Sequence, residues 1–147
     1  MEIKPFIGYG ELFLGMTRSE IYELLGSPDS EESEKWPDET QSDAWKYFPS
    51  ALELTFSSED DFRLTTITTF SKEAKLDGVS PIGLSEEDLK KQFPKVLLDD
   101  DFEESGKDYV YPDYEISFWL IDSVVENLTL FPKYEQDQET IIWPKRS

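Results

Sequence analysis

The chain has 147 residues and a formal net charge of −19, and it contains neither cysteine nor histidine. These absences exclude a disulfide framework, a thiol nucleophile, a cysteine-ligated zinc site and an imidazole base. Hydrophobic residues make up 37% of the chain and aromatic residues 14%, which is enough apolar material for a core. Disorder throughout the chain is therefore not expected, despite the charge.

The negative charge is spread over the whole chain. Residues 1–75 carry 16 acids and 7 bases, and residues 76–147 carry 17 acids and 7 bases. Binding to nucleic acid or to anionic membranes is disfavoured, because both depend on clustered lysine and arginine. A basic protein partner is favoured, since complementary fields speed encounter. The alternative is that the charge serves solubility alone.

A short amphipathic helix is predicted for residues 17–25. Thr17 followed three residues later by Glu20 forms a capping box. Three apolar residues recur at helical spacing and form one stripe: Ile21, Leu24 and Leu25. Gly26 can adopt the left-handed conformation that ends helices, and Pro28 prevents the helix from continuing.

Three strands are predicted after this helix, at residues 45–48, 52–56 and 64–70. The acidic run from Asp29 to Asp43 that precedes them is expected to be a solvated loop. Alternation of apolar and polar residues in 52–56 indicates a half-buried strand. In 64–70 neither alternate set of residues is cleanly apolar, so a β-bulge is expected there.

The same order of patterns then recurs. Ser85 and Asp88 form a second helix start, and the acidic run from Asp99 to Glu104 is expected to be a second solvated loop. Three further segments resemble the earlier strands: residues 109–111, 114–118 and 127–131. This duplication predicts an α+β fold of two tandem helix-plus-antiparallel-sheet repeats, with the helices packed on one face of a joined curved sheet. Residues 1–75 would form repeat one and residues 76–147 repeat two of a single compact unit.

The helix opened by Leu14-Gly15-Met16-Thr17 and closed by Leu25-Gly26-Ser27-Pro28, with strands after it, resembles a known pattern. It is similar to the tandem beta-lactamase-inhibitor-protein-like fold and to small outer-membrane assembly lipoproteins. The chain departs from both, because it has no cysteine for a disulfide bond or for lipid attachment. The resemblance implies a protein that binds another protein on the open face of its sheet. By build and charge the chain also resembles bacterial immunity proteins, which neutralise a toxin.

Catalytic and cofactor motifs are not found in the sequence. The acidic run from Asp99 does not fit an EF-hand, because Glu104 and Val110 stand where glycine and glutamate are required. A looser cation site in this run stays open as an alternative. With no nucleophile motif and no phosphate-binding glycine loop, we expect a non-enzymatic protein without cofactor or metal. A small ligand carrier or an enzyme with a carboxylate-lined pocket is the alternative.

Aromatic and acidic residues supply the candidate partner-binding surface. Tryptophan and tyrosine are frequent interface anchors, and carboxylates pair with the lysine and arginine of a basic partner. The residues expected at this surface are Trp45, Tyr47, Glu53, Asp99, Asp100, Asp101, Glu103, Tyr109, Tyr111, Glu115 and Trp119. The sequence thus predicts an immunity or inhibitor protein that occludes a basic toxin or enzyme. It does not indicate an oligomeric state.

The compartment follows from what the sequence does not contain. The start, Met1-Glu2-Ile3-Lys4-Pro5, does not resemble a signal peptide, and no stretch approaches the roughly 18 apolar residues of a membrane span. We therefore expect a soluble, cytoplasmic protein that binds neither membrane nor nucleic acid.

Overall fold

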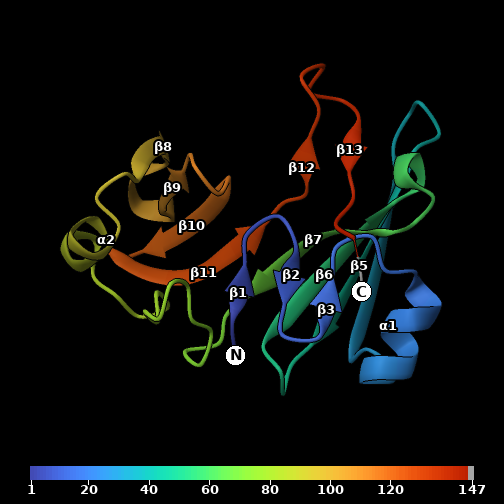
Figure 1. Cartoon of the computed structure of the whole chain (residues 1–147), viewed down its shortest axis with the longest axis horizontal. Helices are drawn as coiled ribbons and strands as arrows, with labels where there is room; N and C mark the ends of the chain where they lie inside the picture. The colour runs from blue at the N-terminus through green and yellow to red at the C-terminus, as the bar shows by residue number, and fades with distance from the viewer. Residues whose placement is uncertain (146–147) are drawn as a thin grey trace.

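A computed structural model describes residues 1–145, and one eight-stranded antiparallel sheet dominates it (Figure 1). The strands lie in the order β4–β5–β6–β7–β11–β10–β9–β8. Their bounds, in chain order, are β4 Ser30–Lys35, β5 Gln41–Tyr47, β6 Leu52–Ser57, β7 Leu64–Thr69, β8 Leu97–Asp101, β9 Lys107–Tyr111, β10 Ile116–Ile121 and β11 Val124–Leu130. Only the β7–β11 pairing joins strands that are not neighbours in the sequence. The edges of the sheet are therefore β4 and β8.

Smaller elements surround this sheet. The helices are α1 (Arg18–Leu25) and α2 (Glu86–Gln92), and two single 3-10 turns are η1 (Ser58–Asp60) and η2 (Glu103–Ser105). The short strands are β1 (Ile3–Lys4), β2 (Gly8–Tyr9) and β3 (Leu12–Phe13), which form a three-stranded sheet, and β12 (Lys133–Tyr134) and β13 (Ile141–Ile142), which form a hairpin. Neither described helix is long and apolar enough to cross a membrane.

The predicted fold class is wrong. The protein is mostly β, with 43% strand and 14% helix, and a large sheet with two short helices replaces the two expected helix-plus-sheet repeats. The helices lie at opposite ends of the molecule, and β1–β3 cross the middle of the view in Figure 1. The physical reason is size, because α1 and α2 each bury one residue, Ile21 and Leu89 respectively. Helices this short cannot form the apolar layer that was expected of them.

Part of that layer comes from the N-terminal segment instead. Four residues from β1–β3 and the turn after them are buried in the core: Ile3, Tyr9, Leu12 and Leu14. The backbone N–H of Gly15 donates to the carbonyl of Leu64 at 2.8 Å, which ties this segment to β7. The N-terminal segment thereby covers apolar residues of the first half of the sheet.

The predicted helix starts are confirmed, whereas Gly26, with φ 80° and ψ −162°, ends α1 outside the left-handed conformation expected of it. In α1, Thr17 Oγ1 accepts from the Glu20 N–H at 3.2 Å, and the Glu20 carboxylate accepts from the Thr17 N–H at 3.0 Å. In α2, Ser85 Oγ accepts from the Asp88 N–H at 3.1 Å. The predicted apolar stripe of α1 is only partly buried, since Leu24 remains exposed.

Both acidic segments that were expected to be loops contain strands. Most of the segment from Asp29 to Asp43 lies in β4 and the first residues of β5. The first half of the segment from Asp99 to Glu104 lies in β8, and its last two residues lie in η2. Aspartate and glutamate have low strand propensity, so pairing with a neighbouring strand overrides the local preference. An edge strand has only one neighbour, and its charges stay in water while they discourage pairing with other sheets. The expectation of loops is therefore wrong for the parts that form strands, whereas the expected exposure to solvent is confirmed for β4 and β8.

Register divides the sheet into a core face and an open face. On β6 and β10 the buried residues alternate with half-buried ones, which places Leu54 and Phe118 on the core face. Directly paired residues form one continuous row on the open face: Ser30, Lys46, Glu53, Thr68, Thr129, Ser117, Val110 and Leu97. The expected bulge in residues 64–70 is confirmed, because the register shifts where Thr55 and Phe56 face Thr66 and Leu64.

Candidate interaction surface

Four aromatic residues of the predicted surface lie on the core face instead. Tyr47 pairs with Leu52, and Tyr109 pairs with Phe118. Directly paired residues point to the same face, so both tyrosine side chains lie on the core face with these buried neighbours. Tyr47 is 5% exposed and Tyr109 is 2% exposed. The expectation that these two tyrosines are exposed anchors is therefore wrong, because strand register fixes which face they occupy.

Trp45 and Tyr111 are half-buried on the same core face. Trp45 packs edge-on against Phe56, with ring centroids 5.0 Å apart. Tyr111 stacks on Tyr114 at 4.7 Å and meets Phe93 at 5.9 Å. Both side chains pack against the core, and neither serves as an open-face anchor.

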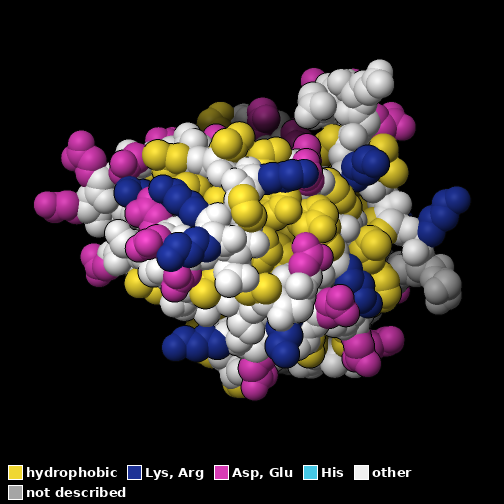
Figure 2. Space-filling model, turned by 60° about the vertical axis from the view of Figure 1, so that its left-hand side comes forward, with side chains coloured by type: hydrophobic (Ala, Val, Ile, Leu, Met, Phe, Trp, Pro, Cys, Tyr) yellow, Lys and Arg dark blue, Asp and Glu magenta, His cyan; other side chains and the backbone are white. Residues whose placement is uncertain are grey.

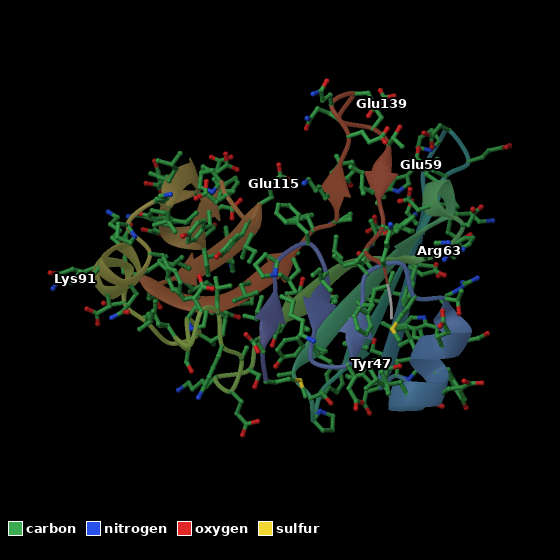
Figure 3. All side chains as sticks on the ribbon, in the orientation of Figure 1. Tyr47, Glu59, Arg63, Lys91, Glu115 and Glu139 are labelled. Atoms are coloured by element: carbon green, nitrogen blue, oxygen red, sulfur yellow. The ribbon has the colours of Figure 1, made fainter. Side chains whose placement is uncertain are left out.

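The two buried tyrosines connect the sheet to the helices. Tyr47, which lies beside α1 in Figure 3, donates its hydroxyl to the carbonyl of Gly26 at 2.9 Å. Tyr109 donates its hydroxyl to the carboxylate of Glu86, which also accepts from Lys107 Nζ at 3.1 Å. Burial, together with nearby carboxylates, raises the pKa of both tyrosines to about 12. These residues hold the helix ends in place and are structural.

The two predicted glutamates lie in different settings. Glu53 is on the open face, where its carboxylate lies 3.7 Å from Lys46 Nζ. Glu115 was expected in a strand on that face, and this placement is wrong. It lies in the turn before β10 with a φ of +50° and is exposed, on the side toward β12 in Figure 3.

Trp119 does lie on the open face, between Asn127 and Asp108 on the neighbouring strands. The ring of Phe102, which is 51% exposed, contacts the Trp119 ring with centroids 5.8 Å apart. We call these two residues the aromatic pair. Sequence reasoning missed Phe102, although an aromatic residue inside a run of acids was a signal available for it.

Carboxylates follow β8, η2 and β9, the elements at the same end of the sheet as the aromatic pair. We call this group the acidic corner; it consists of Asp99, Asp100, Asp101, Glu103, Glu104 and Asp108. Within residues 1–145, no member of the acidic corner forms an ion pair. At the opposite edge, by contrast, Glu32 on β4 lies 3.3 Å from Lys46 Nζ. The acidic corner therefore carries uncompensated negative charge, and four of its members were predicted from the sequence.

The carboxylates of the acidic corner influence one another. Asp108 faces Asp100 across the β8–β9 ladder and is half-buried. Burial raises the pKa of Asp108, and the charges of Asp99 and Asp100 raise it further. The surroundings of Asp108 thus disfavour the charged form of its carboxyl group.

Replacement of Asp108 by asparagine is expected to stabilise the fold at pH 7. Because the pKa of Asp108 is raised in the folded state, the folded chain binds the proton of Asp108 more tightly than the unfolded chain does. In the wild type, the stability contributed by this proton is complete below the unfolded pKa and is lost as pH rises through the folded pKa. The gain from Asp108→Asn should therefore shrink as pH falls toward 4. Urea unfolding at both pH values measures it, with the exposed Glu104→Gln as control. An Asp108→Asn variant that is no more stable than wild type at pH 7 would contradict this account.

The predicted surface residues do not form one patch. Trp45, Tyr47 and Glu53 belong to β5 and β6, whereas most of the others belong to β8–β10. Six strand steps separate β5 from β8, which corresponds to roughly 30 Å along the sheet. Only the acidic corner and Trp119 come together as a candidate site.

Other surfaces offer less to a protein partner. In Figure 2 carboxylates project mostly from the periphery of one face, while hydrophobic side chains gather near its centre. A polar pocket of about 510 Å³ lies between η1 and the β12–β13 hairpin, lined by Glu59, Asp60, Tyr134 and Glu139 among others. Glu59 and Glu139 are labelled near this hairpin in Figure 3.

Among residues 1–145, no group of three or more acidic side chains is placed to hold a metal ion.

Comparison with known proteins gives no family, since no family model, no curated protein and no solved structure matches the chain. The resemblance to beta-lactamase-inhibitor-protein-like proteins stays a prediction.

Proposed function

We propose that the protein is a non-enzymatic module that binds a basic protein at the acidic corner. In its most concrete form it is an immunity or inhibitor protein that occludes a basic toxin or enzyme. The uncompensated charge of the acidic corner, placed beside an aromatic pair in which Phe102 is exposed and Trp119 is half-buried, is the observation that supports this proposal.

The two parts of this surface have different roles. Unpaired carboxylates attract lysine and arginine of the partner and speed encounter, because the complementary fields act beyond contact distance. Phe102 and Trp119 offer a large area with few rotatable bonds, which suits an anchor at the centre of an interface. Charge without an aromatic anchor would give weak, non-specific attraction. Specific binding therefore requires the carboxylates and the aromatic pair to lie close together.

The opposite edge of the sheet lacks this combination. Every residue of β4 is polar or charged, and Glu32 is already neutralised by Lys46. Trp36 is exposed, but it lies in the hairpin after β4 rather than on the strand. We therefore place the contact at β8 and treat β4 as a matched control surface.

A small-ligand carrier is the second candidate. The pocket lined by Glu59, Asp60 and Glu139 supports it, since carboxylates around an open cavity of about 510 Å³ suit a small organic cation. A small molecule that co-purifies with the native protein and is lost in Glu59→Gln would favour this candidate.

Neutralisation of three acids at the acidic corner tests the proposed function. Asp99→Asn, Asp100→Asn and Asp101→Asn together should slow association with a basic protein captured from the native host by about ten-fold at low ionic strength. Asparagine keeps the Asp100 and Asp101 side-chain acceptors for the backbone N–H groups of Asp101 and Glu103. The difference from wild type should disappear at about 0.5 M salt, where screening removes the steering.

The matched control changes net charge equally at the other edge, with Glu31→Gln, Glu32→Gln and Glu34→Gln on β4. These substitutions should leave the association rate near that of wild type. Equal slowing by both triple variants, or a captured partner that is acidic, would refute the acidic corner as the binding site.

A further inference from the structure

We infer that the partner binds by strand addition, in which a basic extended segment pairs with the free edge of β8. This inference rests on the proposed function and supplies its binding mode. Strand addition joins a partner through backbone hydrogen bonds and gains specificity from alternate side chains.

The outer edge of β8 is available for such pairing. Within the described residues β8 pairs only with β9, and all five of its residues are exposed. Leu97 is 58% exposed and Leu98 is 50% exposed. An exposed edge strand with large apolar side chains is a liability for association unless something covers it. The strand of the opposite edge, β4, exposes no apolar residue.

Register assigns the β8 side chains to the two faces of the sheet. Leu97 pairs with Val110, and Asp100 pairs with Asp108, so both lie on the open face. Leu98 pairs with Tyr109, and Asp101 pairs with Lys107, so both lie on the core face. The register shifts at Asp99. On each face, therefore, the edge offers a leucine followed by a carboxylate.

A complementary segment must match both faces. The antiparallel arrangement continues the pattern of the sheet and is the more stable pairing per residue. Its sequence then begins with two basic residues opposite Asp101 and Asp100, continues with one spacer, and ends with two apolar residues opposite Leu98 and Leu97. Cross-strand pairs of opposite charge and of apolar residues are the pairs that stabilise sheets.

Two features limit what can bind there. The Asp101 N–H already donates to the Asp100 carboxylate at 3.0 Å, so the added backbone pairs mainly with residues 97–99. Asp100 and Asp101 are then reached by the basic side chains of the segment. A second copy of this chain fits poorly, because an antiparallel β8–β8 pair centred on Asp99 would set Leu97 opposite Asp101 and bring the acids of both copies together.

Two synthetic peptides with blocked ends and equal composition provide the test. The forward peptide has two arginines, one threonine and two valines in that order between flanking threonines, and the reversed peptide has the valines first. We expect the full chain to bind the forward peptide about ten-fold more tightly, since only this order pairs charge with charge and leucine with valine in an antiparallel ladder. Equal binding of both peptides, or binding of neither, would overturn strand addition.

Amide hydrogen exchange locates the bound peptide. Strand addition should protect outward-facing amides within Leu97–Asp99, while amides of Ser30–Lys35 on β4 stay unchanged. Leu97→Ser with Leu98→Ser should weaken the forward peptide about ten-fold, and Trp36→Ser, which also removes an exposed apolar side chain, should not. Both variants remove exposed residues, and urea unfolding verifies that they fold.

The two proposals fail in different ways. Protection that appears on other strands, with none on β8, overturns strand addition but leaves the basic partner in place. The proposed function falls instead if neutralising the acidic corner has no more effect on the captured partner than neutralising β4.

Discussion

Phe118→Ala is expected to lower the free energy of unfolding by about 4 kcal/mol. Phe118 is fully buried on β10, between Leu128 and Tyr109 on the adjacent strands, and it stacks on Phe93 with ring centroids 5.9 Å apart. Alanine would remove the transfer free energy of the ring and leave a cavity that neighbouring strands cannot close. Domains of this size have free energies of unfolding of about 5–15 kcal/mol, so Phe118→Ala would remove a large part of the total stability.

Urea unfolding followed by tryptophan fluorescence measures this loss. Phe102→Ala is the matched control, because it removes the same ring from an exposed position beside Trp119. The control should cost less than about 1 kcal/mol. If both variants lose similar amounts, Phe118 does not occupy the core position described here.

Gly106→Ala has the second large expected effect, about 3 kcal/mol of lost stability. Gly106 precedes β9 with a φ of +142°, a conformation that side chains rarely adopt. A Cβ atom there would lie 2.5 Å from a ring carbon of Trp119 and 2.6 Å from the carbonyl oxygen of Leu120. Backbone strain and the clash therefore add, and the Trp119 ring must shift from its position.

Gly78→Ala separates strain from clash. Gly78 has a φ of +82°, but no atom would lie within 4 Å of an added Cβ. The free energy of unfolding of this control should fall by about 1 kcal/mol, because alanine at a positive φ is strained even without a clash. Gly106→Ala should in addition change Trp119 fluorescence and weaken the forward peptide. Equal losses in the two variants would mean that Trp119 does not pack over Gly106.

Local signals in the sequence predicted local structure well. The capping residues Thr17 and Ser85 begin helices as expected, and alternation in residues 52–56 identifies a strand with its apolar side in the core. Hydroxyl caps and period-two patterns act over a few residues, so they need no knowledge of the rest of the chain. The bulge facing Thr55 and Phe56 was predictable for the same reason.

The errors came from interactions between segments, which the pattern of a single segment does not show. Nothing local in Ser30–Lys35 or Leu97–Asp101 indicates a strand, because pairing with β5 and β9 decides their conformation. The helices were given more weight than their single buried residues justify, which made two repeats look convincing. The N-terminal strands, which fill part of the expected helix layer, gave only weak patterns.

For the candidate site, the sequence identified the kind of residue better than its place. The acids Asp99, Asp100 and Asp101 and the aromatic Trp119 lie at the same end of the sheet, on β8 and β10, which are separated only by β9. Tyr47 and Tyr109 were assigned to the wrong face, since an aromatic residue in a strand is equally suited to either side until register is known.

The order of the strands also determines how the sheet assembles during folding. Strands β4–β7 and β8–β11 each follow one another along the chain, so these pairings close short loops. The seam between β7 and β11, where Thr68 shares a hydrogen bond of 2.8 Å with Thr129, requires segments about sixty residues apart to meet. Among the pairings of the eight-stranded sheet, closing that seam carries the largest entropic cost, and we expect it to form after the two sets of sequential strands.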